Sequence, residues 1–324
     1  MKSSNVLKLV LDNYDVKVIE FNSETTSKFS NFIKKIYVIN LKQDVIKRNY
    51  VICLMKKLGL SFSLVVVKPI TDVLYLSMCP KKHITRPEAG CSLSHLWCLR
   101  NFIDKQYHNC IVFEDDIVVH KQFKSRFFKI YNNNPKYDFI LLGAHDYSHA
   151  FLNCSFSKND KDSIYKPHKH TKFLYGAHAN YYSLKGATAM FKLHSHHLSF
   201  YDNYYKELFM YLNDTACVCD PNLVVSDISQ SSISHQHELL SLKEKQYYKN
   251  CFANFDFTSY HFVYLMFIKN MQHPLADDTY ETYMKRQILK YFNQDQNKTD
   301  IILKRLSYTF LSIDDVKLLF NDTK

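Results

Sequence analysis

Apolar and mixed stretches alternate along the chain in a pattern that predicts an α/β fold. Two runs rich in β-branched and aromatic residues predict strands at Lys35–Leu41 and Phe62–Val67. Between them, apolar positions recur at helical spacing from Asp44 to Gly59, which predicts a helix bounded by these two residues. The order strand, helix, strand is typical of the start of a parallel sheet.

The middle of the chain continues this alternation. A helix is predicted over residues 88–105, and the wholly apolar run 110–113 predicts a strand buried on both faces. Residues 148–171 are polar and irregular, which predicts a surface loop. The remaining predictions are helices at residues 123–131, 185–193 and 200–212, and strands at residues 137–143, 173–184 and 216–225.

Composition and net charge indicate the class of protein and the kind of partner that it binds. Hydrophobic residues at 46% and charged residues at 23% are typical of a globular chain. The net charge of +11 favours an anionic partner, either a nucleotide diphosphate or a nucleic acid. The basic residues are scattered rather than gathered in a stripe, so nucleic-acid binding is the weaker interpretation.

The pattern of cysteines and the lack of a signal-like segment indicate the cellular compartment in which the protein is expected. The 9 cysteines follow no repeating spacing, and those in apolar runs are typical of small core residues: Cys53, Cys91, Cys98 and Cys110. No stretch resembles a signal peptide or is long enough to span a bilayer. We therefore expect a reducing, cytoplasmic location without a transmembrane segment.

Three consecutive carboxylates, Glu114, Asp115 and Asp116, follow the predicted buried strand. Acidic groups so close together repel one another and resist burial unless a cation compensates them. Hard oxygen ligands suit Mg²⁺ or Mn²⁺, which carry phosphate oxygens in their remaining positions. The alternative is a solvated acidic turn, but the apolar flanks on both sides favour a metal site. Ligands in open α/β sheets bind beyond the carboxyl ends of strands, where this cluster is expected.

Several motifs in order resemble glycosyltransferase family 25, which includes lipooligosaccharide and collagen galactosyltransferases. Tyr-Val-Ile-Asn-Leu at 37–41 resembles its opening strand, and Pro-Glu-Ala-Gly-Cys-Ser-Leu-Ser-His at 87–95 resembles its Gly-Glu-Ile-Gly-Cys-x-Leu-Ser-His. Its Glu-Asp-Asp element is similar to residues 114–116, and further similarities occur at residues 138–143, 175–187 and 227–233. Asp202 stands where the family has Pro-Ile/Val-Asp, without the Pro. Departures include Pro87, Ala89 and Gln43, the last in a segment usually rich in arginine.

The resemblance covers residues 35–237 and implies a GT-A-like catalytic domain with a mixed nucleotide-binding sheet flanked by helices. Residues 1–34 are then an N-terminal extension, and residues 238–324 a mainly helical C-terminal region. The implied activity is inverting transfer of a sugar, galactose or glucose, from a UDP-sugar to a hydroxyl of a glycan or protein acceptor. A divalent cation, Mn²⁺ or Mg²⁺, is the implied cofactor.

The resemblance also implies roles for individual residues. The candidate metal ligands are Glu114, Asp116 and, near the end of the domain, His237. Which of Glu114, Asp115 and Asp116 touches the metal stays open, because neighbouring side chains of a strand point to opposite sides. The donor nucleotide is expected beside Asn40, Arg48, Glu88, Ser92, His95, Glu114 and Asp115. Asp202 is the first candidate for the catalytic base and Asp146 the second. The structural alternatives are a helix cap for Asp202, an exposed helix position for Arg48, and support of the loop for Glu88, Ser92 and His95.

Two other functions remain open at this point. The departure at Gln43 and the unassigned C-terminal helices fit a catalytically degenerate family member that acts as a binding or scaffold protein. The three carboxylates and the positive net charge also fit a metal-dependent nucleic-acid enzyme. The oligomeric state is not predicted.

Overall fold

A computed structural model describes residues 3–23, 27–80, 83–119, 122–133, 137–143, 163–165, 176–196, 198–220 and 223–226. The helices predicted within residues 238–324 lie outside these ranges. Among the helices that are described, none is both long enough and apolar enough to cross a bilayer.

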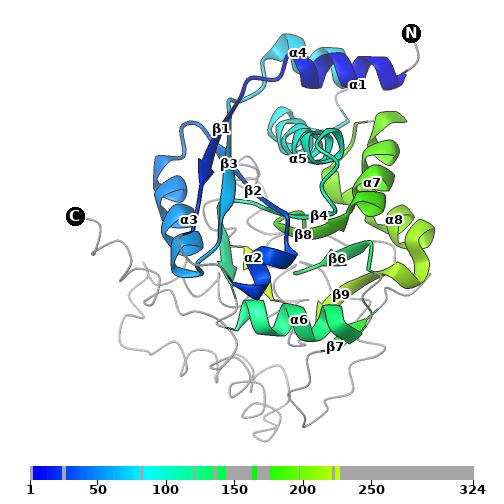
Figure 1. Cartoon of the computed structure of the whole chain (residues 1–324). Coiled ribbons are helices and arrows are strands. Elements are labelled where there is room, and N and C mark those ends of the chain that lie inside the picture. The colour runs from blue at the N-terminus through cyan, green and yellow to red at the C-terminus, as the bar shows by residue number, and fades with distance from the viewer. Residues whose placement is uncertain are drawn as a thin grey trace, which may run out of the picture.

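The centre of the molecule is a mixed sheet of eight strands in the order β1-β3-β2-β4-β8-β6-β9-β7 (Figure 1). β2 runs parallel to both β3 and β4, and β6 runs parallel to β9, whereas the other pairs are antiparallel. The strands are β1 (Val16–Phe21), β2 (Lys35–Leu41), β3 (Phe62–Val67), β4 (Asn109–Phe113), β6 (Phe139–Leu141), β7 (Ser163–Tyr165), β8 (Ala179–Ser183) and β9 (Ala216–Asp220). β5 (Ile117–Val119) and β10 (Val224–Ser226) form a separate antiparallel pair. The predicted α/β class and its parallel start are confirmed.

Helices cover both faces of this sheet. One face packs against α1 (Ser3–Asp12), α4 (Asp72–Met78), α5 (Arg86–Asp104), α7 (Leu184–His196) and α8 (Tyr205–Leu212). The other face packs against α2 (Lys28–Phe32), α3 (Val45–Lys57) and α6 (Phe123–Asn133). Side chains of the central strands alternate between the two cores, so Tyr37 of β2 lies in the first core and Val38 in the second.

The structure corrects three sequence-based boundaries. The helix predicted at residues 200–212 is a 3₁₀ turn, η1 (Tyr201–Tyr204), followed by α8, and the strand predicted at 216–225 is divided into β9 and β10. The loop predicted at residues 148–171 contains β7, which pairs antiparallel with β9. β7 has only three residues, which is too short a run to show the alternating pattern that predicts a strand.

The N-terminal extension is built into the sheet. β1 pairs antiparallel with β3, with Val16 opposite Val67 and Phe21 opposite Phe62. α1 packs against α4, α5 and α7 through residues of the first core such as Leu7. Residues 3–21 therefore form part of the same sheet and the same core as the segment that begins at residue 35.

Candidate active site

The acidic cluster lies directly after β4, at the edge of the sheet where β2 and β3 also end. All residues of β4 are buried, and the Glu114 backbone N–H donates to the His178 carbonyl at 2.9 Å. Parallel pairing places Val38 of β2 beside Phe113, so two residues further on Asn40 comes next to Asp115. The predicted position of the cluster, beyond the carboxyl ends of parallel strands, is therefore the observed one.

Asp115 is fixed by Asn40 and Arg48. The Asn40 amide Nδ2 donates to Asp115 Oδ2 at 2.6 Å, and Arg48 Nε donates to Asn40 Oδ1 at 2.7 Å. Arg48 Nη2 also donates to the carbonyl of Lys42 at 2.5 Å. Burial raises the pKa of Asp115 to about 6, although Lys47 and the Asn40 hydrogen bond act in the opposite direction. Asn40 and Arg48 thus form a chain of contacts that holds this carboxylate in place.

Lys47 supplies a positive charge between two of the carboxylates. Its Nζ lies 3.5 Å from Asp116 Oδ2 and 3.9 Å from Asp115 Oδ1, and its side chain is only 13% exposed. Burial lowers the pKa of Lys47, but the charges of Asp116 and Asp115 outweigh this effect and raise it overall. Sequence reasoning missed Lys47. Its only signal was its place next to Arg48, in the helix after the strand that carries Asn40.

Glu114 faces α5 and is held by two side chains of that helix. His95 Nε2 lies 3.0 Å from Glu114 Oε1, and the Cys91 thiol donates to the same oxygen at 3.4 Å. Burial would raise the pKa of Glu114, but the hydrogen bond from His95 and the charge of its imidazole lower it overall. Cys98 and Cys110 are buried, which confirms the prediction of small core residues for these two, whereas Cys53 and Cys91 are only half-buried and correct it.

One set of donor atoms among the described residues has the spacing of a metal site. The Cys91, His95 and Glu114 ligand atoms all lie within 4.8 Å of one another, a mixed set that suits a softer ion such as Zn²⁺. Burial and the charge of Glu114 raise the pKa of the Cys91 thiol well above its usual value. Without a metal ion the thiol therefore stays protonated and donates its hydrogen bond to Glu114. The carboxylates of Asp115 and Asp116, by contrast, already converge on the positive charge of Lys47. Their hard oxygen atoms are of the type that Mg²⁺ and Mn²⁺ prefer, but in this structure the ammonium of Lys47 lies against both of them.

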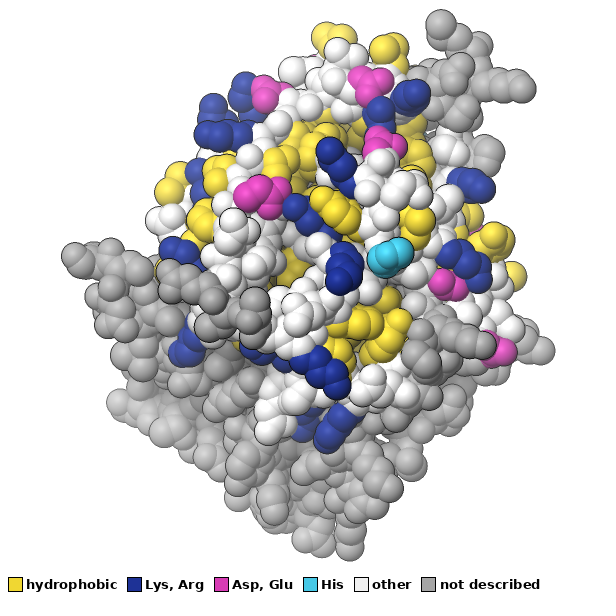
Figure 2. Space-filling view, in the orientation of Figure 1, with side chains coloured by type: hydrophobic (Ala, Val, Ile, Leu, Met, Phe, Trp, Pro, Cys, Tyr) yellow, Lys and Arg dark blue, Asp and Glu magenta, His cyan; other side chains and the backbone are white. Residues whose placement is uncertain are grey.

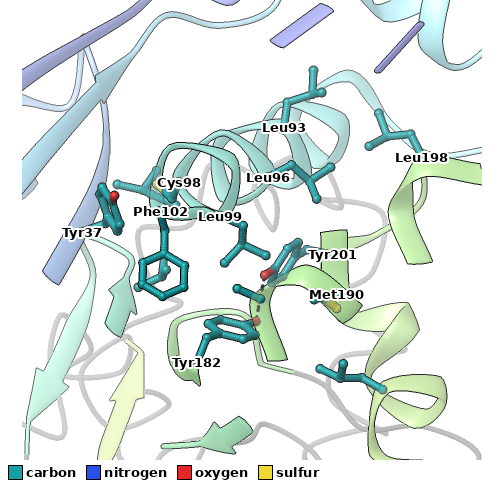
Figure 3. Packing of buried hydrophobic residues seen from close by; sticks show 14 of the residues in the cluster. Tyr37, Leu93, Leu96, Cys98, Leu99, Phe102, Tyr182, Met190, Leu198 and Tyr201 are labelled. Carbon is teal, nitrogen blue, oxygen red and sulfur yellow. Dashed lines mark hydrogen bonds between the residues drawn. The ribbon is translucent and has the colours of Figure 1, made fainter. Parts of the chain in front are cut away.

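Asp202 lies in η1, next to the α5 residues that hold Glu114. The ring of Tyr201 stacks on His95 with centroids 4.3 Å apart, and its hydroxyl lies 2.8 Å from that of Tyr182 (Figure 3). The Gly176 backbone N–H donates to Asp202 Oδ2 at 3.0 Å. Burial raises the pKa of Asp202 to about 6, although the Gly176 hydrogen bond acts in the opposite direction. Asp202 is therefore a buried carboxylate that holds its proton more strongly than an ordinary aspartate.

Two of the expected nucleotide residues hold the start of α5 in place. Glu88 Oε2 accepts a hydrogen bond from the Thr85 backbone N–H at 2.6 Å, which forms a capping box. The Ser92 hydroxyl donates to the Ser199 carbonyl at 2.7 Å and so connects α5 to the segment before η1. The candidate base Asp146 and the candidate ligand His237 lie outside the described residues.

A pocket of about 340 Å³ opens beside the acidic cluster. Its wall combines the three carboxylates with Lys47, with the ends of β2 and β3, and with the first turns of α5. Within the described part of the chain, six of the expected site residues do not line this wall: Asn40, Arg48, Glu88, Ser92, His95 and Asp202. The arrangement offers cationic and anionic groups at one place and apolar side chains such as Ile39 and Val67 at another.

Comparison with known proteins adds one finding to this geometry. A sequence model of the family described as glycosyltransferase family 25 (LPS biosynthesis protein) matches residues 33–201, just over half of the 324 residues. No curated protein matches the chain. The matched segment contains β2, α5 and the acidic cluster, whereas α1 and β1 lie before it and Asp202 directly follows it.

Proposed function

The chain belongs to glycosyltransferase family 25, and from this premise we propose that it transfers a sugar from a UDP-sugar to a hydroxyl of a glycan or protein acceptor. Galactose and glucose are the proposed sugars. The observation that carries the proposal is the pocket of about 340 Å³ that meets Glu114, Asp115 and Asp116 at the carboxyl ends of parallel strands. This is the edge at which α/β sheets bind nucleotides.

The proposed donor site uses the charged part of the pocket for the diphosphate. Asp116 and Glu114 would hold Mn²⁺ or Mg²⁺, which when bound acts as a Lewis acid toward the charge that develops on the leaving diphosphate. Lys47 adds a fixed positive charge 3.5 Å from Asp116. Asn40 and Arg48 keep Asp115 in place through hydrogen bonds of 2.6 and 2.7 Å, so the cluster is oriented before a donor binds.

Asp202 is the proposed catalytic base. In an inverting transfer, the acceptor oxygen forms a bond to the anomeric carbon while the bond from that carbon to the diphosphate breaks. The acceptor hydroxyl gives its proton to a carboxylate on the side opposite the leaving group. A pKa of about 6 leaves Asp202 ionised at neutral pH yet more basic than an ordinary aspartate. The backbone N–H of Gly176 fixes the direction of this carboxylate.

We propose a catalytic domain over residues 35–237, joined by the N-terminal segment that shares its sheet and core. In this division, residues 238–324 form a separate region. The acceptor is proposed to contact segments outside the strands, because loops vary in sequence and carry binding specificity on a fixed scaffold.

A second function is favoured by the contacts around the carboxylates. Glu114 already accepts hydrogen bonds from His95 and Cys91, and Lys47 lies between Asp115 and Asp116. A family member that binds a nucleotide without turning it over would have the same arrangement. The nucleic-acid enzyme is not favoured, because Lys and Arg are scattered over the face in Figure 2 among acidic and apolar side chains.

The test is to incubate the purified full chain with UDP-galactose or UDP-glucose, with Mn²⁺ or with EDTA, and to measure release of UDP. Calorimetry with UDP measures binding separately. Asp116→Asn is the test variant, and Asp104→Asn, at a 64% exposed side chain at the end of α5, is the matched control. Release by the wild type and the control but not by Asp116→Asn supports the transferase. UDP binding without release favours the binding protein, and neither binding nor release refutes both.

A further inference from the structure

The wall of the candidate nucleotide pocket includes Tyr14, which lies before the segment matched by the family. Tyr14 follows α1 and precedes β1, and it is 8% exposed to solvent. It lines the same pocket as Glu114, Asp115 and Asp116. The N-terminal segment therefore contributes to the pocket as well as to the edge of the sheet.

The order of the strands places Tyr14 and the acidic cluster at different strands of one edge of the sheet. β1, β3, β2 and β4 are consecutive neighbours, and β1 begins at Val16 opposite Val67, the last residue of β3. Neighbouring strands lie about 4.8 Å apart, so β1 and β4 are separated by about 14 Å. The pocket thus extends along the edge of the sheet, from the carboxylates after β4 to Tyr14 before β1.

The two ends of this pocket differ in chemistry. The end at β4 carries the three carboxylates and Lys47, whereas the wall near β1 and β3 carries Tyr14, Val67 and Ile70. Two cations are also there: Lys68, which forms an ion pair with Asp15, and Arg86, which pairs with Asp72. A nucleoside diphosphate also has two chemically different ends: a charged diphosphate and a flat base with apolar faces. An aromatic side chain is the usual partner of such a base.

Contacts with α5 hold Tyr14 in position. Its hydroxyl lies 2.9 Å from Ser94 Oγ and 3.3 Å from the carbonyl oxygen of Gly90. The Ser94 hydroxyl donates to that same carbonyl at 2.7 Å, which leaves Ser94 Oγ to accept from Tyr14. The helix that orients Glu114 through His95 and Cys91 thus also orients the phenol ring, so both ends of the pocket are fixed by one element.

We propose that Tyr14 is the base-recognition residue of the donor site and that its ring stacks on the nucleobase. The inference rests on the proposed function, because it takes the pocket to bind a nucleoside diphosphate. It adds that a segment outside the family match completes the site and contributes to the choice of donor.

The test compares UDP with inorganic pyrophosphate, which lacks the base, by calorimetry on the full chain in the presence of Mn²⁺. The variants are Tyr14→Ala, Tyr14→Leu and Tyr14→Phe, and Tyr211→Ala, at a 68% exposed tyrosine, is the matched control. Loss of the ring should weaken UDP binding about tenfold or more, because stacking of one base on one aromatic ring is worth that much. Pyrophosphate binding should stay within about twofold, and Tyr14→Phe should bind UDP like the wild type.

The possible results separate this inference from the proposed function. Equal UDP affinity in the wild type and Tyr14→Leu overturns the inference, and so does an equal loss of UDP and pyrophosphate binding. A loss in Tyr14→Phe as large as in Tyr14→Leu overturns the stacking role, because the ring is still present. If Tyr14→Ala fails to fold in a thermal unfolding assay, Tyr14→Leu decides the matter, since it keeps apolar volume. A wild type that binds no UDP instead refutes the proposed function.

Discussion

Replacement of Lys47 by methionine tests whether the acidic cluster needs a cation. Methionine keeps the length and apolar stem of the side chain but removes the charge next to Asp115 and Asp116. At an effective dielectric constant of about 20, unit charges at the observed separations of 3.5 and 3.9 Å attract by about 4–5 kcal/mol each. Part of this attraction offsets the cost of burying the ammonium, so the net loss is smaller.

We expect Lys47→Met to lower the free energy of unfolding by about 2–4 kcal/mol, somewhat less than the loss of one partner from a fully buried ion pair. The corresponding fall in Tm is about 5–10 °C for a domain of this size. Mn²⁺ should raise the Tm of the variant by more than it raises that of the wild type. The reason is that the metal replaces the missing charge in the variant, whereas in the wild type it shares the carboxylates with Lys47.

Thermal unfolding followed by circular dichroism, with Mn²⁺ or with EDTA, measures both effects without any enzyme assay. Lys185→Met is the matched control, because Lys185 is 60% exposed and pairs with Asp138 at 2.9 Å. The Asp138 side chain is only 13% exposed but keeps its hydrogen bonds from Ser183 and Thr215, so removal of the exposed Lys185 ammonium should cost about 1 kcal/mol or less. A Lys47→Met protein with the Tm of the wild type and an equal response to Mn²⁺ would refute the interpretation of the cluster as a cation site.

Three further predictions follow from other contacts. Asp202→Asn should abolish UDP release while UDP binding persists. The wild-type rate should decline as the pH falls through about 6, because Asp202 then takes up a proton and ceases to be a base. A rate that does not change across this pH range contradicts the assignment. Asn40→Ala should cost about 1.5–3 kcal/mol in urea unfolding, because Asp115 loses a buried hydrogen bond to a charged oxygen; a change below about 0.5 kcal/mol excludes that contact. Gly143→Ala should prevent stable folding, because the new methyl group would lie 1.7 Å from the backbone carbonyl oxygen of Val224. Gly90→Ala should keep the wild-type Tm, because the atom nearest to its methyl group, in the Ile70 side chain, would lie at 3.8 Å.

The position of the acidic cluster followed from local sequence alone. The strands at Lys35–Leu41 and Phe62–Val67 were predicted with the bounds that the structure has. The cluster at residues 114–116 was predicted at the end of a buried strand. The family was identified from motifs most of which lie within the segment that the family model matches. These features depend on the spacing of apolar residues and on short motifs, and both are properties of neighbouring residues.

The partners of the cluster could not be predicted in the same way. Lys47 lies 68 positions before Asp115, and Tyr14 lies 80 positions before Ser94. Whether such residues meet depends on which strands are neighbours and in what register they pair. The antiparallel placement of β1 beside β3 is the clearest case, because no pattern in the N-terminal sequence indicates with which strand β1 pairs.

The sequence by itself therefore determined the class of fold, the family and the edge of the sheet that carries the carboxylates. The tertiary structure decided which groups surround those carboxylates: Lys47 beside Asp115 and Asp116, and His95 and Cys91 on Glu114. It also brought Tyr14 into the wall of the pocket. The physical reason is that charge compensation and hydrogen bonding act over a few ångströms in space, across separations along the chain that only the packed strands and helices bring together.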